Sequence, residues 1–391
     1  MLKQPFDMPI MTSDEIFKTI LQFTRQMGPD YRHFTFQVDN TKLQSGIDDI
    51  LPSGSDESFQ NYAKRISTIL KNKRFGISLG DFQTAMNMDC WNRFRYFLKS
   101  LYENAEMPVG LSELSLFAGN YLSTLRGVHL DDADVFCFVL EGKKRMRLWP
   151  RTFFEGRPLN TRIDHNGYKG YLEQSICLEG TAGDILYWPQ SYWHVGECAG
   201  NFDVSLSLAL HHTDTDLNQV VEKFRRQLEK SWKLNGDINR FTLDMSGLAA
   251  RTTSMNEAFQ MAGDLFDIET ALVGKWMKNV TGYSFVSTPF PAAQITLKNH
   301  ELLKADGAFP VLSRRMGDKL IIAFNGQVLT MAFNAKILSI IEILNSGEPL
   351  TAGEVIRYST NKKEEAFPMN TAAVRKFLGS LLAHGALTKI G

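Results

Sequence analysis

Apolar residues recur at helical spacing in the first hundred residues of the chain. Thr12 and Glu15 have the spacing of a capping box, in which each side chain bonds the backbone N–H of the other residue. The apolar face of the helix that begins there comprises Ile16, Ile20, Phe23 and Met27, and Gly28 ends it. Two more helices are expected near residues 59–73 and 91–104, so this region is predicted to be mainly helical.

Short apolar runs and turns replace the helical pattern between residues 111 and 210. Residues 135–140 form a continuous apolar run, a turn follows at Glu141 and Gly142, and residues 144–149 form a second expected strand. Further strands are expected at 185–188 and at 204–210, where apolar residues alternate with small ones. This pattern favours a β-sandwich or barrel over a doubly wound sheet. The polar insert 151–170 is predicted to be a loop beside an active-site mouth.

The remainder of the chain is predicted to be helical up to about residue 280, with a proline-containing boundary at 287–293. Beyond it, two strands are expected at 319–324 and 327–333. Three helices and a final strand are then expected at 336–345, 352–358, 370–384 and 386–390. This order is the one expected of a winged helix.

Composition narrows the classes of protein that the chain can represent. The 391 residues include 43 basic and 43 acidic side chains, and the pI is near 7.1, which excludes a broadly basic nucleic-acid-binding protein. No apolar run reaches the roughly 18 residues that span a bilayer. The four cysteines form no CxxC pair, and acidic residues interrupt the N-terminal segment where a signal peptide would lie. We therefore expect a soluble cytoplasmic protein with no membrane partner.

The candidate chemistry begins at His129-Leu130-Asp131. An imidazole and a carboxylate two residues apart on an extended segment point to the same side and can bind one metal ion. His194, which follows an expected strand, is the best third ligand. Two histidines and one aspartate form a facial triad with open positions, which suits Fe(II) and O₂ better than structural zinc. The alternative is that both histidines are ordinary residues at the rim of a barrel, hydrogen-bonded to the backbone.

The motifs resemble those of the JmjC-type cupin 2-oxoglutarate/Fe(II) oxygenases. The matching segments are 127–136, Gly142 with Lys144, and the run Gly-Asp-Ile-Leu-Tyr-Trp-Pro at 183–189 followed by Trp193-His194. The resemblance covers about residues 110–212 and is closest to the ribosomal oxygenase group. It implies that Fe(II) binds to His129, Asp131 and His194 and that Lys144, fifteen residues after His129, holds the 2-oxoglutarate carboxylate.

The same resemblance implies the fold class and the domain order. The fold class is α+β: a double-stranded β-helix (cupin/JmjC) barrel with N-terminal helices, a helical linker region and a C-terminal winged helix. The corresponding ranges are 1–212 for the catalytic domain, 213–290 for a helical, dimerisation-like region and 291–391 for the winged helix. A homodimer is therefore expected.

Other residues could support the site. Ser207, on the small-residue face of its strand, and Thr124, five residues before His129, are candidates for binding the co-substrate carboxylate; each could also be a plain barrel-lining residue. Lys144 could be a solvated strand-end charge, as its neighbours Lys143 and Arg145 are expected to be on the opposite face. The second HxD motif, at 212–214, has no lysine on a following strand, so it is not expected to bind metal.

The predicted activity is a 2-oxoglutarate- and Fe(II)-dependent hydroxylation of a protein or peptide side chain, with O₂ as oxidant. Two alternatives stay open: an oxygenase of a small metabolite, and a non-catalytic cupin and winged-helix binding protein. The expected recognition helix mixes Arg375 and Lys376 with apolar residues, and basic residues are not concentrated there. Protein or peptide contact is therefore favoured over DNA contact for the C-terminal module.

Overall fold

The computed structural model describes residues 1–27, 34–157, 165–213, 215–234, 259–263, 267–285, 287–289, 291, 295–360 and 371–390. These residues form two compact units, which are described separately. The first comprises Met1–Thr213 with Phe285–Phe290, and the second comprises Asp214–Ser284 with Pro291–Gly391. No described helix is both long and apolar enough to cross a bilayer.

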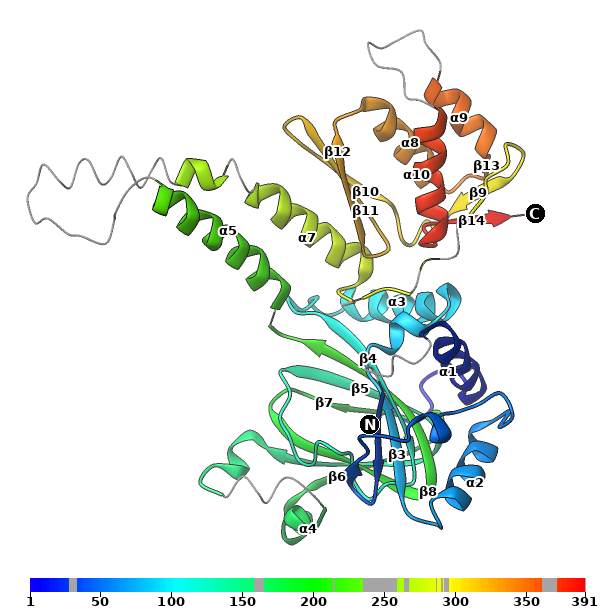
Figure 1. Cartoon of the computed structure of the whole chain (residues 1–391), viewed down its shortest axis with the longest axis vertical. Helices are drawn as coiled ribbons and strands as arrows, with labels where there is room; N and C mark the ends of the chain where they lie inside the picture. Colours follow the sequence, from blue (N-terminus) through cyan, green and yellow to red (C-terminus); the bar gives the residue numbers. More distant parts are fainter. Residues whose placement is uncertain are drawn as a thin grey trace, which may run out of the picture. The chain divides into compact units, whose positions relative to one another are not determined.

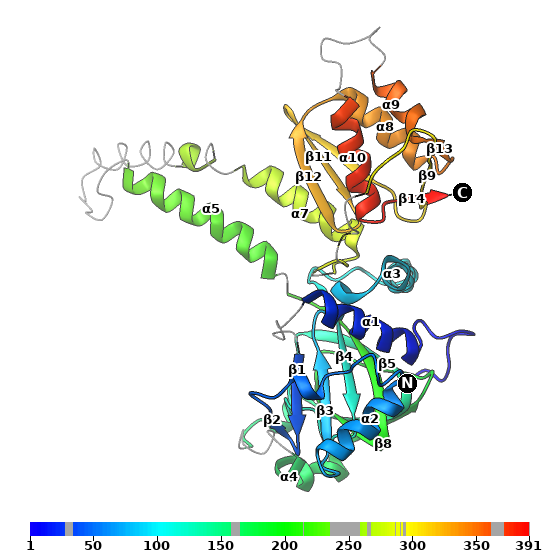
Figure 2. The same ribbon diagram turned by 45° about the vertical axis from the view of Figure 1, so that its right-hand side comes forward.

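One curved sheet organises the first unit (Figures 1 and 2). Its strands have the order β2-β1-β3-β4-β8-β5-β6, and β7 also pairs with β5. The described pairings within it are antiparallel. The bounds are β1 Phe34–Val38, β2 Thr41–Lys42, β3 Phe75–Leu79, β4 Ser112–Gly119, β5 Ala133–Pro150, β6 Ile176–Thr181, β7 Ile185–Trp188 and β8 Tyr192–His211.

Three helices pack with this sheet: α1 (Ser13–Met27), α2 (Phe59–Ile69) and α3 (Met88–Tyr102). The predicted capping box of α1 is present, because the backbone N–H of Thr12 donates to Glu15 (2.8 Å) and that of Glu15 donates to Thr12 Oγ1 (3.2 Å). Strands β1 and β3 lie between these helices in the chain. The prediction of a mainly helical N-terminal region was therefore incomplete, because it overlooked two five-residue segments in which large apolar residues alternate with polar or small ones.

The two strands expected on either side of Glu141 and Gly142 form one strand, β5. It pairs with β8 on both sides of this position, with irregularities between Val139 and Glu141 and between Gly142 and Lys144. The expected turn is thus a pair of register shifts within a continuous strand. The strand expected at 204–210 is likewise the second half of the longer β8. Residues 158–164 of the predicted loop lie outside the described residues, and short helices, including α4 (His165–Tyr168), occupy its described parts.

The second unit contains helices and two small sheets. Its bounds are α5 Thr215–Leu234, α7 Ile268–Gly282, β9 Leu302–Ala305, β10 Leu312–Met316, β11 Lys319–Phe324, β12 Gln327–Ala332, α8 Ala335–Asn345, β13 Leu350–Thr351, α9 Ala352–Thr360, α10 Thr371–Ala383 and β14 Leu387–Ile390. The sheets have the orders β10-β11-β12 and β13-β9-β14. The C-terminal strands and helices expected from the sequence are present, whereas β9, β10 and β13 were not expected. Residues 235–258, part of the predicted helical region, lie outside the described residues.

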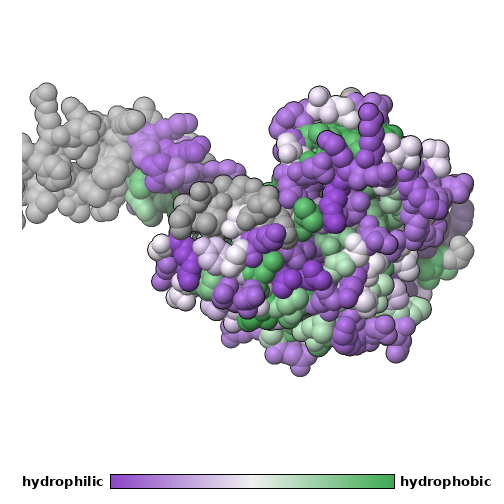
Figure 3. Space-filling view, turned by 90° about the horizontal axis from the view of Figure 1, so that it is seen from below, coloured by the Kyte–Doolittle hydropathy of each residue, from purple (hydrophilic) through white to green (hydrophobic). Residues whose placement is uncertain are grey.

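Polar residues dominate the molecular face drawn in Figure 3, and apolar residues lie in small groups between them. Apolar packing is concentrated inside each unit instead. The core of the second unit, for example, joins β11 to α8 and α10 through buried residues that include Ile322, Ile341 and Leu381.

Gly142 gives a test of the irregularity in β5. Its φ is +72°, and a Cβ there would lie 1.9 Å from the carbonyl oxygen of Phe202 in β8. Gly142→Ala should lower the free energy of unfolding by roughly 3 kcal/mol or more, because strain at positive φ adds to a backbone clash. Gly156 is the matched control: its φ is also +72°, but no atom lies within 4 Å of an added Cβ. Equal losses for the two variants in urea unfolding would contradict the close contact between β5 and β8.

Candidate metal centre

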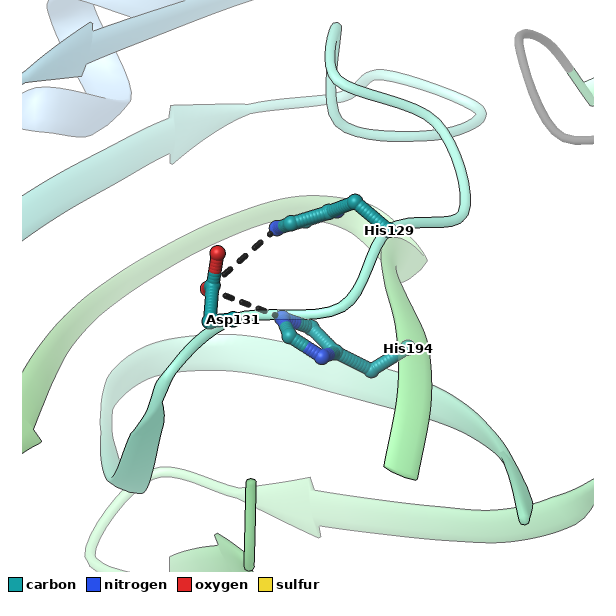
Figure 4. Close-up of side chains that lie close together, drawn as sticks. All are labelled: His129, Asp131 and His194. Carbon is teal, nitrogen blue, oxygen red and sulfur yellow. Dashed lines mark ion pairs between the residues drawn. The ribbon is translucent and has the colours of Figure 1, made fainter. Parts of the chain in front are cut away.

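His129, Asp131 and His194 come together although they lie on separate parts of the chain (Figure 4). His194 is in β8, and His129 lies on the segment before β5. An isolated β-bridge joins the two histidines: the backbone N–H of His129 donates to the His194 carbonyl (3.0 Å), and that of His194 donates to the His129 carbonyl (2.8 Å). Asp131 follows two residues later. The potential ligand atoms of the three side chains all lie within 4.8 Å of one another.

The backbone around the histidines fixes which nitrogen faces the carboxylate. His129 Nδ1 lies 2.9 Å from the Gly127 carbonyl oxygen, and His194 Nδ1 lies 3.3 Å from that of Tyr192. A carbonyl accepts a hydrogen bond, so we assign a proton to Nδ1 of each ring. Nε2 is therefore the ring nitrogen that faces Asp131, whose Oδ2 lies 3.4 Å from both Nε2 atoms.

Electrostatics make this cluster a good cation site. Burial would raise the pKa of Asp131, but its contacts with the two imidazoles outweigh burial, so that its pKa is lowered and the carboxylate is ionised. Burial lowers the pKa of His194, which favours its neutral form. This carboxylate and the two imidazoles place their potential ligand atoms within 4.8 Å of one another. The donor set therefore fits a divalent metal, and two imidazoles with one carboxylate suit Fe(II).

All six site residues predicted from the sequence line one cavity of about 670 Å³. These residues are Thr124, His129, Asp131, Lys144, His194 and Ser207. Ser207 in β8 lies opposite Ser115 of β4, and the backbone N–H of Thr124 donates to the Gly196 carbonyl (2.8 Å). Gly196 keeps space open in the wall, because a Cβ there would lie 3.3 Å from Lys144 Nζ.

Lys144 is buried, with 2% of its surface exposed, and its neighbours in β5 face the other side of the sheet. Lys143 and Arg145 both pair with Glu179 of β6. Lys144 instead donates a hydrogen bond to Tyr121 Oη and lies 3.6 Å from Asp203 Oδ1. The sequence did not indicate Tyr121 and Asp203 as part of this environment, because no motif contains them.

The structure also places the aromatic residues near His194 and the second HxD motif. Of the aromatic residues near His194, Trp188 contacts its ring, with centroids 5.1 Å apart, and lines the cavity. Tyr187 instead packs against Phe136, with ring centroids 4.9 Å apart, and does not line the cavity. His212 of the second HxD motif pairs with Asp134 (Nε2–Oδ2 3.4 Å), while Asp214 lies outside the described residues.

Comparisons with known proteins agree with this site. Residues 99–218 match the family model described as "JmjC domain". The domain, together with its His-Asp-His cluster, identifies a JmjC-type 2-oxoglutarate-dependent oxygenase, the class whose cofactors and co-substrates are Fe(II), 2-oxoglutarate and O₂. The class predicted from the sequence is thus confirmed.

The chain is also similar to solved structures of the ribosomal oxygenase YcfD from Escherichia coli. One of these structures is of the protein in complex with cobalt and 2-oxoglutarate. Its sequence is 14% identical, the match covers 100% of this chain and 94% of that chain, and the TM-score is 0.50. A second structure of the same protein has 14% identity, the same coverage and a TM-score of 0.49. At this identity the similarity shows a shared fold. No curated protein matches the chain.

Metal binding tests the cluster directly. His129→Ala should weaken binding of Co(II), measured by calorimetry, on the order of a hundredfold or more, because it removes one nitrogen ligand. His212→Ala is the matched control, since it removes the histidine of the other HxD motif and should leave Co(II) binding unchanged. Loss of Co(II) binding in the His212 variant, with retention in the His129 variant, would show that the second HxD motif binds the metal and that the assignment to His129 is wrong.

Proposed function

We propose that the protein hydroxylates a side chain of a protein or peptide, using Fe(II), 2-oxoglutarate and O₂. The observation that carries the proposal is that a cation site and a buried lysine line the same cavity. His129, Asp131 and His194 form a cation site in its wall, and a buried lysine, Lys144, lies in the same wall. A metal site and a carboxylate anchor are what a bidentate, dicarboxylate co-substrate requires.

The side chains of the cavity have distinct roles in this proposal. His129, Asp131 and His194 hold Fe(II), which when bound supplies the oxidative decarboxylation of 2-oxoglutarate by O₂. Lys144 binds the distal carboxylate by a charge-assisted hydrogen bond in a poorly hydrated wall, and Ser207 and Thr124 add hydroxyl groups nearby. Trp188, buried against His194, excludes water from the reacting groups.

The exposed Arg126 side chain also lines the cavity, where it contacts one of the three metal ligands. It pairs with Asp131 through the carboxylate oxygen that does not face the histidines (Nη1–Oδ1 3.1 Å), and its side chain is 72% exposed. This contact leaves Oδ2 directed at the cation site and restrains rotation of the carboxylate. Arg126 is therefore a positioning residue for the third ligand.

A protein or peptide substrate is proposed on two grounds. The similar E. coli structures are of a ribosomal oxygenase, and a large part of this chain lies outside the JmjC match. A small metabolite is the alternative substrate. A non-catalytic binding role is less well supported, because the complete His-Asp-His cluster and the buried lysine line one cavity.

The finer architecture belongs to the same proposal. We assign residues 1–212 to a double-stranded β-helix with N-terminal helices, residues 213–290 to a helical region that supports a homodimer, and residues 291–391 to a winged helix. In α10, Arg375 donates to the Leu297 carbonyl (Nη1–O 2.6 Å) and to Asn299, so its guanidinium is engaged within its own unit. This engagement favours a protein contact over a DNA contact for the module.

Turnover in the presence of cellular proteins tests the function. With Fe(II) and 2-oxoglutarate, the wild-type protein should produce succinate together with peptides that are 16 Da heavier, detected by mass spectrometry. His129→Ala should produce neither, since its metal site is incomplete. Succinate that depends on a small-molecule fraction and leaves proteins unmodified would support the alternative substrate. Equal succinate production by both proteins would refute the assigned metal site.

The anchor is tested by a pair of adjacent lysines. Lys144→Ala should raise the KM for 2-oxoglutarate by about tenfold or more, because a charge-assisted hydrogen bond to the distal carboxylate is lost. Lys143→Ala should leave the KM unchanged, since Lys143 pairs with Glu179 on the other face of β5. Metal affinity, measured in parallel, should be the same in both variants. An equal effect of the two substitutions on the KM would remove Lys144 from the site.

A further inference from the structure

A buried carboxylate, Asp203, lies directly behind the proposed anchor. It is fully buried in β8, where it is paired with Gly119 of β4 on one side and with Gly142 of β5 on the other. Two glycines next to it leave room for its side chain and for that of Lys144. Burying an ionisable group costs free energy unless partners compensate for the lost water.

Asp203 is connected to Lys144 through one phenol. Tyr121 Oη donates to Asp203 Oδ1 (3.0 Å) and accepts a hydrogen bond from Lys144, whose Nζ is 3.6 Å from the same carboxylate oxygen. The ammonium also lies over the rings of Tyr121 and Phe117, 4.8 and 5.4 Å from their centroids. Asp203 Oδ2 accepts no hydrogen bond from the described residues. The carboxylate is thus only partly satisfied.

The other ionisable groups around Asp203 are Tyr121, Cys198 of β8 and Cys137 of β5. Burial raises the pKa of Tyr121 well above its ordinary value, and it raises the pKa of the Cys198 thiol to about 12 and that of Cys137 as well. All three are therefore neutral near pH 7. Burial also raises the pKa of Asp203, to about 6, against the attraction of Lys144. Asp203 is the member of this group whose charge can change near neutrality.

A bound dicarboxylate changes the balance of charges around Lys144. With Asp203 ionised, the anchor and its buried neighbour have no net charge, and little attraction remains for an anion. A second carboxylate at Lys144 would leave two negative groups sharing one cation in a poorly hydrated wall, which favours protonation of one of them. The buried Asp203, with its free Oδ2, can accept that proton more easily than the ligand carboxylate, which Lys144 contacts directly.

We propose that Asp203 is a positioning residue of the co-substrate anchor: it holds Lys144 through Tyr121 and takes up a proton from solution when 2-oxoglutarate binds. The proposal rests on the function proposed above, in particular on Lys144 as anchor. It adds a proton to the binding equilibrium and no covalent step. Asp203 does not touch the co-substrate; it acts through the charge that Lys144 presents.

Calorimetry on the Mn(II)-loaded protein tests this proposal without turnover. Titrations with 2-oxoglutarate in PIPES and in Tris, at about pH 7, should show that the wild type takes up close to one proton per ligand bound. Its affinity should fall by about tenfold per pH unit between roughly pH 6.5 and 8, because protonation of Asp203 becomes more costly as the pH rises. A dependence on pH of this size does not follow from a purely structural role.

Asp203→Asn should bind 2-oxoglutarate more tightly than the wild type above about pH 7, with no proton uptake and less than about a twofold change over the same range. Asp184→Asn is the matched control. Asp184 is also a buried carboxylate, with 1% of its surface exposed, but it pairs with Lys3 (2.8 Å) and does not line the cavity of the metal site. This variant should keep the proton uptake of the wild type.

The outcomes separate the two proposals. Binding by the wild type with no proton uptake would overturn the role of Asp203 and leave the anchor in place. Uptake that persists in the Asp203→Asn protein would overturn it as well, and it would assign the proton to another group. Absence of 2-oxoglutarate binding by the Mn(II)-loaded wild type would refute the proposed function itself.

Discussion

The site depends on the pairing of β5 with β8 and on the two irregularities in it. In a regular strand, side chains alternate between two faces, so Val135 and Lys143 would lie on the same side. The register shifts between Val139 and Lys144 reverse this alternation. As a result Val135, Lys144 and Met146 line the same cavity, and Lys143 faces away from it. Gly142 permits the change because it has no side chain. Its φ is positive, and a Cβ there would collide with the carbonyl oxygen of Phe202.

The same pairing explains why distant residues of β8 converge. His194 and Gly196 lie in its first half, Ser207 lies in its second half, and all three line the cavity. The interior that results contains groups that are unfavourable in isolation. In the His-Asp-His cluster two imidazoles lie close to one partly buried carboxylate, and Lys144 is paired with a fully buried aspartate. A cation reduces the first cost, whereas in the proposal above an anion at Lys144 is accommodated by protonation of Asp203.

Much of the site could be predicted from the sequence because its signals are local. His129 and Asp131 are two residues apart, His194 follows an expected strand, and the family resemblance added Lys144. Strand alternation around Lys144 was inferred correctly over three residues. Alternation could not have related Lys144 to Val135, since the register shifts between them leave no clear sequence pattern.

Tyr121 and Asp203 escaped prediction because their importance arises from strand register. They are 82 residues apart, and only the pairing of β8 with β4 and β5 brings them to Lys144. The strands β1 and β3, by contrast, could have been predicted, because in both of them large apolar residues alternate with polar or small ones over five residues. The C-terminal helices were predicted well, because each has an apolar face long enough to recognise.

Anomalous diffraction from crystals of the protein with Mn(II) and 2-oxoglutarate tests the central claim most directly. The account predicts one manganese peak in contact with Nε2 of His129, Nε2 of His194 and the Asp131 carboxylate. It also predicts that the distal carboxylate of 2-oxoglutarate lies at Lys144 Nζ. A manganese peak elsewhere, or a 2-oxoglutarate molecule that does not contact Lys144, would contradict it.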